Sequence, residues 1–399
     1  MRVLLFTGKG GVGKTSAAAA TALRAASSGL RTLVMSTDPA HSLADALDVP
    51  LGGEPTPVAP GLEGQQIDAR ARLEENWRQI QAYLVELLRW GGVDEVEAEE
   101  LSVLPGLEEI FSLIDVRRHV DAARHDLLVV DCAPTAETLR LLSLPDALGW
   151  YLNRLFPTHR RLAGAVRPVL GKVTTMPLPA DRVLGSVADL AGTLDRVRAI
   201  LVDAETTSVR LVVNPEALVV AEARRTATYL SLFGYHVDAV VVNRVLPDAV
   251  TDPFFDRWRE RQAAHLRAVE HGFGGAPVLR VPLFDDEPVG EEALQRLADA
   301  LYHDVDLAAV LHRGEPLRVE RSAGDLVLSL ALPNASKGEL DLYRRGDELS
   351  VRVGAYTRTL TLPAALARGE VAGAELRGGR LEVRFAAPAA PSTAGGARR

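Results

Sequence analysis

The chain has 399 residues, 47% of them hydrophobic and 25% charged, and its formal net charge is −8 at pH 7. The composition is ordinary for a soluble globular protein, the length exceeds what one hydrophobic core usually organises, and the negative charge argues against nucleic acid as a partner. Because no apolar run approaches the ~20 residues of a membrane span and no signal peptide is evident, we expect a cytoplasmic protein whose contact with membranes is at most transient.

Residues 1–311 alternate short apolar runs with helical stretches. The first expected strand is "RVLLFT" at residues 2–7, and the alanine-rich residues 16–29 form the helix that follows. Further strands are expected at residues 31–37, 127–131, 209–214, 238–244 and 277–282. These runs are nearly continuous in Val, Leu and Ile, as in strands that are buried on both faces. The pattern predicts an α/β fold with a doubly wound, mostly parallel sheet.

Two segments, residues 68–125 and 136–203, break this alternation. Their apolar residues recur at helical spacing, and both segments are too long for loops. We therefore predict helical insertions that form a subdomain beside the sheet. The apolar stripes of such helices are most often core, and a surface that binds a protein client is the alternative.

The composition changes after residue 311. Residues 312–318 are the expected linker. Residues 319–386 alternate apolar with polar residues and are punctuated by Gly, Asn and Asp, which predicts a small antiparallel β-sandwich. Residues 387–399 are rich in Pro, Ala and Gly and are expected to be a disordered tail.

The strongest motif is "GKGGVGKT" at residues 8–15, which has the P-loop pattern G-x-x-x-x-G-K-[ST]. It follows a strand and opens a helix, as a phosphate-binding loop does. Its glycines allow backbone N–H groups to turn inward around a phosphate, Lys14 would neutralise the β and γ phosphates, and the Thr15 hydroxyl would ligate Mg²⁺. The expected nucleotide-binding residues of this loop are Gly8, Lys9, Gly10, Gly11, Val12, Gly13, Lys14, Thr15 and Ser16.

Two carboxylates follow strands beside this loop. Asp38 follows the run at 31–37, and Asp131 ends the run at 127–131. Because parallel strands bring their carboxyl ends to one edge of a sheet, both side chains are expected near the loop. Asp131 has the position of a Walker B acid and Asp38 would orient the attacking water, although each could instead be a helix N-cap. The expected Mg²⁺ ligands, partly through water, are Thr15, Asp38 and Asp131.

Four motifs, "GKGGVGKT", "STDPAHSLADAL", "DCAPTAETLRLLSLP" and "VVVNRVLP", occur in an order that resembles the ArsA-type ATPases. This family includes the arsenite-pump ATPase and the eukaryotic ATPase that delivers tail-anchored membrane proteins. The resemblance covers residues 1 to about 310. It implies hydrolysis of ATP with Mg²⁺ as cofactor, and a homodimer as the working unit.

The same resemblance assigns further site residues. Lys9 would reach across the dimer interface to the phosphates held by the other subunit, which makes it catalytic together with Lys14 and Asp38. The chain has only four lysines, two of them in this loop, which supports a need for compact ammonium groups there. Asn243 would hydrogen-bond the adenine, with Pro282 and Leu283 near the base. The switch segments would contain Asp38, Pro39, Asp131, Pro134 and Thr135.

Residues 319–386 resemble the α-crystallin domain of small heat-shock proteins. The resemblance rests on the strand pattern and on the final strand, "GGRLEVRF". ArsA-type ATPases that carry such a domain occur in bacteria and chloroplasts, and this chain looks most like those.

The cysteines set the chain apart from two members of the family. The eukaryotic targeting ATPase bridges its dimer through zinc held by a C-x-x-C pair, and the arsenite-pump subunit binds metalloid through several cysteines. Cys132 is the only cysteine here, so we expect no zinc and no activation by arsenite.

The leading hypothesis is a homodimeric Mg-ATP-dependent ATPase whose opening and closing controls an apolar helical surface for a hydrophobic protein client. One alternative is an ATPase that drives a metalloid efflux pump. Another is a positioning-type ATPase switch of the septum-site kind, although that class commonly ends in a basic amphipathic helix and this tail does not form one.

Overall fold

The computed structural model describes residues 1–38, 42–67, 85, 107–133, 181–322 and 325–386. Several sequence-based predictions lie outside these residues. They are the tail at 387–399, large parts of the two helical insertions, and the switch residues Pro39, Pro134 and Thr135.

The core of the molecule is an eight-stranded sheet with the order β3-β4-β2-β5-β1-β6-β7-β8. Strand β3 is antiparallel to β4, and every other neighbouring pair is parallel. The predicted α/β fold with a mostly parallel sheet is therefore confirmed. The strands are β1 (Arg2–Thr7), β2 (Thr32–Ser36), β3 (Thr56–Ala59), β4 (Leu62–Gln66), β5 (Leu127–Asp131), β6 (Thr207–Val213), β7 (Val237–Val245) and β8 (Val278–Pro282).

The hairpin of β3 and β4 was not predicted from the sequence. Both strands are short and lack a continuous apolar run, and β4 ends in two buried glutamines. The Gln65 amide is satisfied there because it donates to the Gly53 carbonyl at 2.8 Å and to the Asp115 carboxylate at 3.4 Å. Burial of polar side chains through tertiary hydrogen bonds leaves no apolar pattern for a strand prediction to use.

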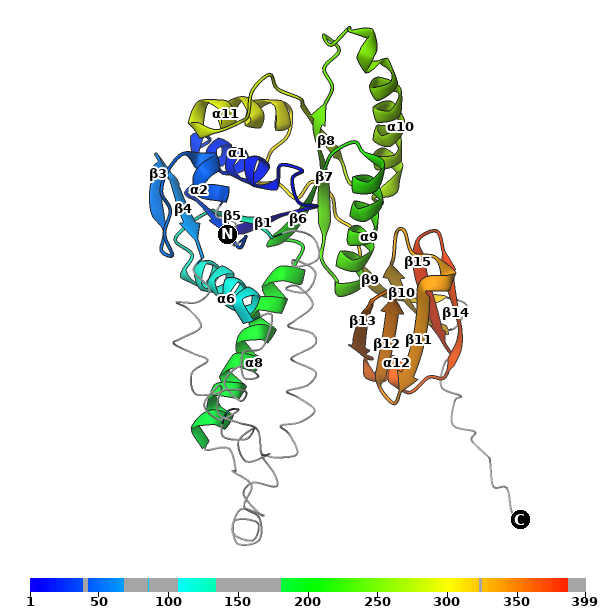
Figure 1. Ribbon diagram of the computed structural model, residues 1–399. Helices are drawn as coiled ribbons and strands as arrows, with labels where there is room; N and C mark the ends of the chain where they lie inside the picture. Colours follow the sequence, from blue (N-terminus) through cyan, green and yellow to red (C-terminus); the bar gives the residue numbers. More distant parts are fainter. Residues whose placement is uncertain (39–41, 68–84, 86–106, 134–180, 323–324, 387–399) are drawn as a thin grey trace, which may run out of the picture.

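Helices cover both faces of the sheet, because right-handed crossovers that run in opposite directions along the strand order place their helices on opposite faces. Figure 1 shows α1, α2 and α11 together on one side, with α6 and α8 on the other. The first group comprises α1 (Lys14–Ser27), α2 (Ser42–Leu47) and α11 (Gly290–Leu301). The second comprises α6 (Leu107–Ala122), α8 (Asp181–Val202), α9 (Ala217–Phe233) and α10 (Asp256–Gly272), the last preceded by a short 3-10 turn, η1 (Pro253–Phe255).

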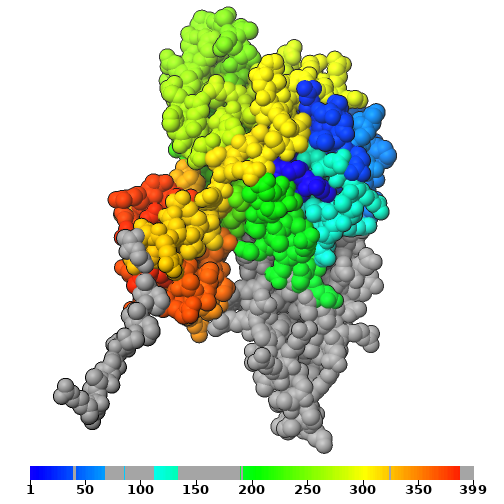
Figure 2. Space-filling view, turned by 180° about the vertical axis from the view of Figure 1, so that it is seen from behind, coloured from blue at the N-terminus to red at the C-terminus, as the bar shows by residue number. Residues whose placement is uncertain are grey.

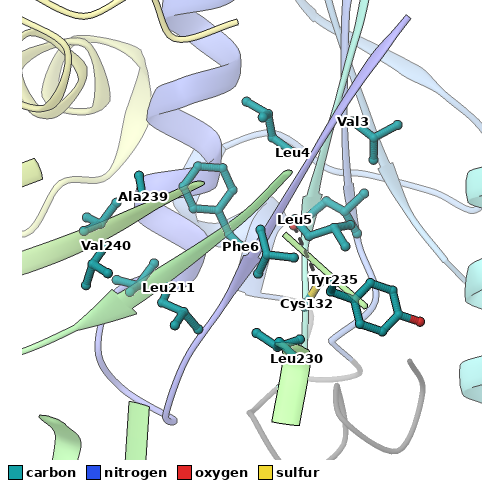
Figure 3. Close-up of a cluster of buried hydrophobic side chains, with 14 of the residues drawn as sticks. Val3, Leu4, Leu5, Phe6, Cys132, Leu211, Leu230, Tyr235, Ala239 and Val240 are labelled. Atoms are coloured by element: carbon teal, nitrogen blue, oxygen red, sulfur yellow. Dashed lines mark hydrogen bonds between the residues drawn. The ribbon is translucent and has the colours of Figure 1, made fainter. Parts of the chain in front are cut away.

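Strand β1 runs through the middle of the hydrophobic core. Its side chains alternate toward the two helical layers, and they pack with residues of β5, β6, β7 and α9 (Figure 3). Cys132 belongs to this core: it is 1% exposed, and its thiol donates to the Val130 carbonyl at 3.8 Å. Burial raises the pKa of this thiol, so it has the character of a packing residue rather than of a reactive one.

A buried ion pair between β6 and β7 also contacts the end of the α/β domain. Arg210 and Asp238 are both 0% exposed, and the guanidinium Nε donates to the carboxylate at 3.3 Å. Arg210 also donates to the Tyr302 hydroxyl at 2.8 Å and to the Leu307 carbonyl at 2.7 Å. The guanidinium thus joins two neighbouring strands to the segment that follows α11.

Removal of the Asp238 carboxylate is expected to destabilise the protein strongly. Asp238→Ala leaves the Arg210 charge buried without its partner, which typically costs about 3–5 kcal/mol. Asp299→Ala is the matched control, because the Arg24–Asp299 pair is exposed and such pairs contribute about 1 kcal/mol or less. Urea denaturation measures both. Equal losses for the two variants would contradict the importance of the buried pair.

The C-terminal part is a sandwich of two antiparallel sheets, as predicted. The four-stranded sheet has the order β14-β15-β10-β9, and the three-stranded sheet has the order β11-β12-β13. The first strand begins at Leu317, inside the stretch predicted as linker. The elements are β9 (Leu317–Ser322), β10 (Asp325–Ala331), η2 (Lys337–Glu339), β11 (Leu340–Arg345), β12 (Glu348–Val353), β13 (Tyr356–Thr361), α12 (Ala364–Ala367), β14 (Val371–Arg377) and β15 (Arg380–Phe385).

The sandwich is docked on helix α9 (Figure 1). Figure 2 shows the sandwich, coloured orange to red, at one side of the molecule. Arg358 is buried and donates to the Leu232 carbonyl at 2.6 Å, near the end of α9. The Tyr356 ring lies 4.5 Å from the Tyr229 ring, centroid to centroid. The Asn334 amide donates to the Arg224 carbonyl at 3.2 Å. These contacts join the two parts through one continuous buried core.

Among the described residues, no helix combines the length and the apolar character that a membrane crossing requires.

Candidate nucleotide site

The glycine-rich loop joins β1 to α1 and can be built only with glycine at two positions. A Cβ atom on Gly8 would lie 2.2 Å from the Val212 carbonyl oxygen. A Cβ atom on Gly13, whose φ is 93°, would lie 2.3 Å from the Asn243 amide nitrogen. The loop is therefore pressed against the ends of β6 and β7, and helix α1 begins directly after it. The N-terminal dipole and unpaired N–H groups of α1 thus face the concave side of the loop, where a phosphate would bind.

Lys14, the first residue of α1, lies under this loop. Its side chain is 6% exposed, and its ammonium donates to the Lys9 carbonyl at 3.4 Å. A nearly buried cation that spans the loop is placed to exchange this long hydrogen bond for a phosphate oxygen.

Asp131 lies at the bottom of the site, at the end of β5. Register pairs it with Phe6 of β1 on one side and with Ser36 of β2 on the other. Its Oδ2 atom accepts hydrogen bonds from the Thr15 hydroxyl at 2.9 Å and from the Ser36 hydroxyl at 3.3 Å. The Thr15 hydroxyl also lies 3.1 Å from the Ser42 hydroxyl. The structure thus brings Thr15 and Asp131 together, as the sequence analysis expected.

The environment of Asp131 suits a divalent cation. The carboxylate is 0% exposed, and among the described residues its Oδ1 atom has no hydrogen-bond partner. Burial raises the pKa of this carboxyl to about 7, the Thr15 hydrogen bond and the Lys14 charge lower it, and the Asp38 charge raises it. A buried, unpaired carboxylate oxygen beside a threonine hydroxyl is a set of hard donors of the kind that Mg²⁺ prefers.

Asp38 directly follows the end of β2, on the same edge of the sheet. Its backbone N–H donates to the Ser36 hydroxyl at 3.1 Å. Its charge acts on the carboxyl of Asp131, so the two predicted carboxylates belong to one electrostatic site. A role in orienting water remains a prediction.

Lys9 points away from the loop toward helix α9. Its ammonium lies 4.0 Å from the Glu222 carboxylate, and its side chain is 42% exposed. Within one chain the lysine therefore lies at the surface, beside its own loop. The contact of Lys9 with a second subunit remains a prediction.

The side chain of Asn243 is hydrogen-bonded to the backbone of the glycine-rich loop. Its amide donates to the Val12 carbonyl at 2.9 Å and its Oδ1 accepts from the Arg244 N–H at 2.9 Å. Pro282 pairs with Val245 on the neighbouring strand, and the Leu283 N–H donates to the Val245 carbonyl at 2.8 Å. The three residues predicted to surround the adenine thus lie at the adjoining ends of β7 and β8, and contact with a base remains a prediction.

Three side chains of this site were not identified from the sequence: Ser36, Ser42 and Glu222. The two serines lie within "STDPAHS", where a hydroxyl just after an apolar strand could have signalled a contact to the strand-end carboxylate. Glu222 gave no signal, because it lies in the middle of an ordinary helix. Among the described residues, no group of three or more His, Cys, Asp or Glu side chains could hold a metal ion by itself.

Comparisons with known proteins agree with this geometry. Residues 1–303 match the profile of the anion-transporting ATPase family, ArsA, and residues 323–385 match the HSP20-like domain found in ArsA. A protein of Aquifex aeolicus with the name "Putative arsenical pump-driving ATPase 1" is 37% identical, over 92% of this chain and 95% of its own length. A protein of Chlorobaculum tepidum with the name "Putative arsenical pump-driving ATPase" is 38% identical, over 92% of this chain and 91% of its own length. An uncharacterized protein of Streptomyces coelicolor is 39% identical, over 97% of both chains.

The family profile covers the whole α/β domain, and the relatives match the chain through both of its parts. The glycine loop, Lys14, Thr15 and Asp131 lie together at one edge of the sheet. The chain is therefore a nucleotide-binding ATPase of the ArsA family, with the HSP20-like C-terminal domain that occurs in that family.

Proposed function

We propose that this protein is a Mg-ATP-dependent ATPase that works as a homodimer and uses the nucleotide cycle to open and close an apolar helical surface for a protein client. The observation that carries the proposal is the site itself: a glycine loop over a buried lysine, beside a threonine and a buried carboxylate whose Oδ1 atom has no partner among the described residues.

The residues of the site have distinct roles in this proposal. Backbone N–H groups of the loop and the Lys14 ammonium bind the phosphates. Thr15 and Asp131 would hold Mg²⁺, in part through its water shell, and the ion would neutralise charge on the phosphates when bound. Asp38 accepts a hydrogen bond from the attacking water and so fixes the direction from which the water attacks.

Lys9 supports the homodimer part of the proposal. It lies at the same edge of the sheet as the site, and its partner Glu222 is itself partly exposed. An exposed ion pair of this kind contributes about 1 kcal/mol or less. The Lys9 ammonium can therefore leave Glu222 and bind the triphosphate of a second subunit. Two such subunits facing each other would each supply a cation to the neighbouring site.

The connection to a client follows from chain topology. Strand β5 carries Asp131 and leads, through Cys132 and Ala133, into the segment where helical insertion is predicted. Helix α8 returns from this segment to β6 and packs on α6. A change at Asp131 that depends on the γ phosphate would therefore act first on the inserted helices.

Nucleotide-dependent client binding tests the proposal. Asp38→Asn protein loaded with ATP should retain a synthetic apolar helix, such as a fluorescently labelled transmembrane peptide, whereas the same protein loaded with ADP should release it. Fluorescence anisotropy measures both states. Equal affinity in ATP and ADP would contradict a surface that the nucleotide controls, and light scattering of the same samples reports whether ATP produces a dimer.

The names of the relatives favour a second candidate, an ATPase that drives an arsenical pump. Metalloid binding through thiolates needs several cysteines, and this chain has only Cys132, which is buried. ATPase activity measured against rising arsenite distinguishes the candidates. If arsenite stimulates the ATPase several-fold and Cys132→Ser abolishes the stimulation, the protein drives an arsenical pump and the client proposal is wrong. An unchanged rate at millimolar arsenite would support the client proposal.

A further inference from the structure

Ser36 occupies a position between the two carboxylates of the site. It is the last residue of β2, and strand register places it directly beside Asp131 of β5. Its side chain is 1% exposed. The hydroxyl therefore belongs to the interior of the site and not to its solvent-facing rim.

The hydroxyl makes two hydrogen bonds of opposite sense. It donates its proton to Asp131 Oδ2 at 3.3 Å, and it accepts the backbone N–H of Asp38 at 3.1 Å. A serine hydroxyl has one proton and two lone pairs, so both bonds can form at once. One buried oxygen thus links the Walker B position to the start of the segment that carries Asp38.

These hydrogen bonds fix the orientation of the Asp131 carboxylate. Its Oδ2 atom is held by two hydroxyls, Thr15 and Ser36, whereas Oδ1 has no partner among the described residues. Two donors on one oxygen restrict rotation of the carboxylate, because rotation would break both bonds and strip a buried group of its partners. The free oxygen is thereby kept in one direction.

We propose that Ser36 is a positioning residue for hydrolysis: it orients Asp131 for the metal's water shell and anchors the backbone of Asp38 at the same time. The inference rests on the proposed Mg²⁺ site. Hydrogen-bond partners of metal-binding carboxylates commonly change metal affinity or activity by about 10–100-fold when they are removed.

The test compares Ser36→Ala with Thr32→Val. Thr32 lies on the same strand and is also fully buried, but its hydroxyl donates to the Leu30 carbonyl at 3.0 Å, at the end of β2 remote from the site. Both substitutions remove one buried hydroxyl, so a loss of stability alone would affect them alike. The full-length protein is used throughout.

Electron paramagnetic resonance of Mn²⁺ with ADP measures metal affinity without turnover. Ser36→Ala should weaken Mn²⁺ binding in the ADP complex by about 10-fold, lower kcat by about 10-fold, and leave metal-free ADP binding unchanged. Thr32→Val should match the parent protein in Mn²⁺ affinity, in kcat and in metal-free ADP binding. If Ser36→Ala does not fold, Ser36→Cys decides, because its weak S–H donor should produce a smaller loss in the same direction.

Two failures are distinguishable. If the parent protein shows no nucleotide-dependent Mn²⁺ binding, the proposed metal site is wrong. If the parent binds Mn²⁺ and the Ser36 variants bind it equally well, with kcat unchanged, the positioning role of Ser36 is overturned while the metal site stands.

Discussion

Asp38→Asn is expected to bind ATP as the parent protein does and to lose turnover by at least about two orders of magnitude, because small errors in the position of a reacting group cost that much. The carboxylate follows β2 on the edge of the sheet where Asp131 ends β5, and the two belong to one electrostatic site. An amide keeps the size of the side chain but presents only one acceptor oxygen and no charge to an attacking water.

Two measurements separate binding from turnover in this variant. Titration with a fluorescent ATP analogue gives the affinity, and phosphate release gives kcat. Asp45→Asn is the matched control, because Asp45 is an exposed carboxylate on the adjacent helix α2 and should have no effect. Turnover of Asp38→Asn near the parent rate would show that Asp38 has no part in positioning the water.

The same variant should shift the pH dependence of metal binding. Burial is the main cause that raises the pKa of Asp131 to about 7, and the Asp38 charge adds to it. A carboxyl with a raised pKa is protonated below that pKa and ionises as the pH rises through it. Because Asp38→Asn removes the neighbouring charge, Asp131 should ionise at lower pH, and the midpoint of the pH dependence of Mn²⁺ binding in the ADP complex should move to lower pH, whatever the loss of Asp38 as an expected ligand does to the affinity itself.

Lys9→Ala is expected to abolish most hydrolysis, by about 10³-fold if the lysine acts as cations supplied in trans do in other phosphoryl-transfer enzymes. Dimerisation that depends on ATP should be lost with it, since the same ammonium would contact both the partner and its nucleotide. Lys337→Ala, which removes an exposed lysine of the sandwich, should change neither property. Phosphate release and light scattering measure the two effects.

Mixing two inactive variants tests whether Lys9 acts on the other subunit. Lys14→Ala disables its own site but still carries Lys9, whereas Lys9→Ala has an intact Lys14. If the two subunits exchange at random, half of the dimers hold one repaired site, and activity should return to about a quarter of the parent rate. An inactive mixture, with light scattering showing that dimers form, would mean that Lys9 acts within its own chain.

Glu222→Gln determines whether the contact of Lys9 within its own chain matters. The two groups are 4.0 Å apart and both are partly exposed, so the pair is expected to contribute about 1 kcal/mol or less. Hydrolysis should therefore change by less than about 5-fold, in contrast with the loss expected for Lys9→Ala. A loss as large as that of Lys9→Ala would place the role of the lysine in this pair.

The local parts of the nucleotide site could be predicted from sequence because each is encoded within a few residues. The spacing of Gly8, Gly13 and Lys14 specifies a loop that only glycine can build, and continuous apolar runs specify the strands around it. Asp131 was predicted at a strand end, and the parallel register beside β1 and β2 brings it to Thr15. Short-range pattern and sheet geometry together were sufficient here.

Contacts between distant segments could not be predicted in this way. The amide of Asn243 braces a loop 231 positions earlier in the chain, and Ser36 reaches a carboxylate 95 positions away. The β3 and β4 hairpin is stabilised by buried glutamines whose partners lie on other elements. Each depends on which strands become neighbours, and the order of strands is a property of the whole sheet.

The sequence by itself determined the α/β class, the phosphate loop, the strand-end carboxylates and the presence of a separate β-sandwich, because glycine spacing and apolar periodicity act locally. Only the tertiary structure decided that the sandwich docks on α9 through Arg358, and that one serine hydroxyl joins Asp131 to the backbone of Asp38. The physical reason is that hydrogen bonds and packing between remote segments form only once the strand order and the faces of the sheet are established.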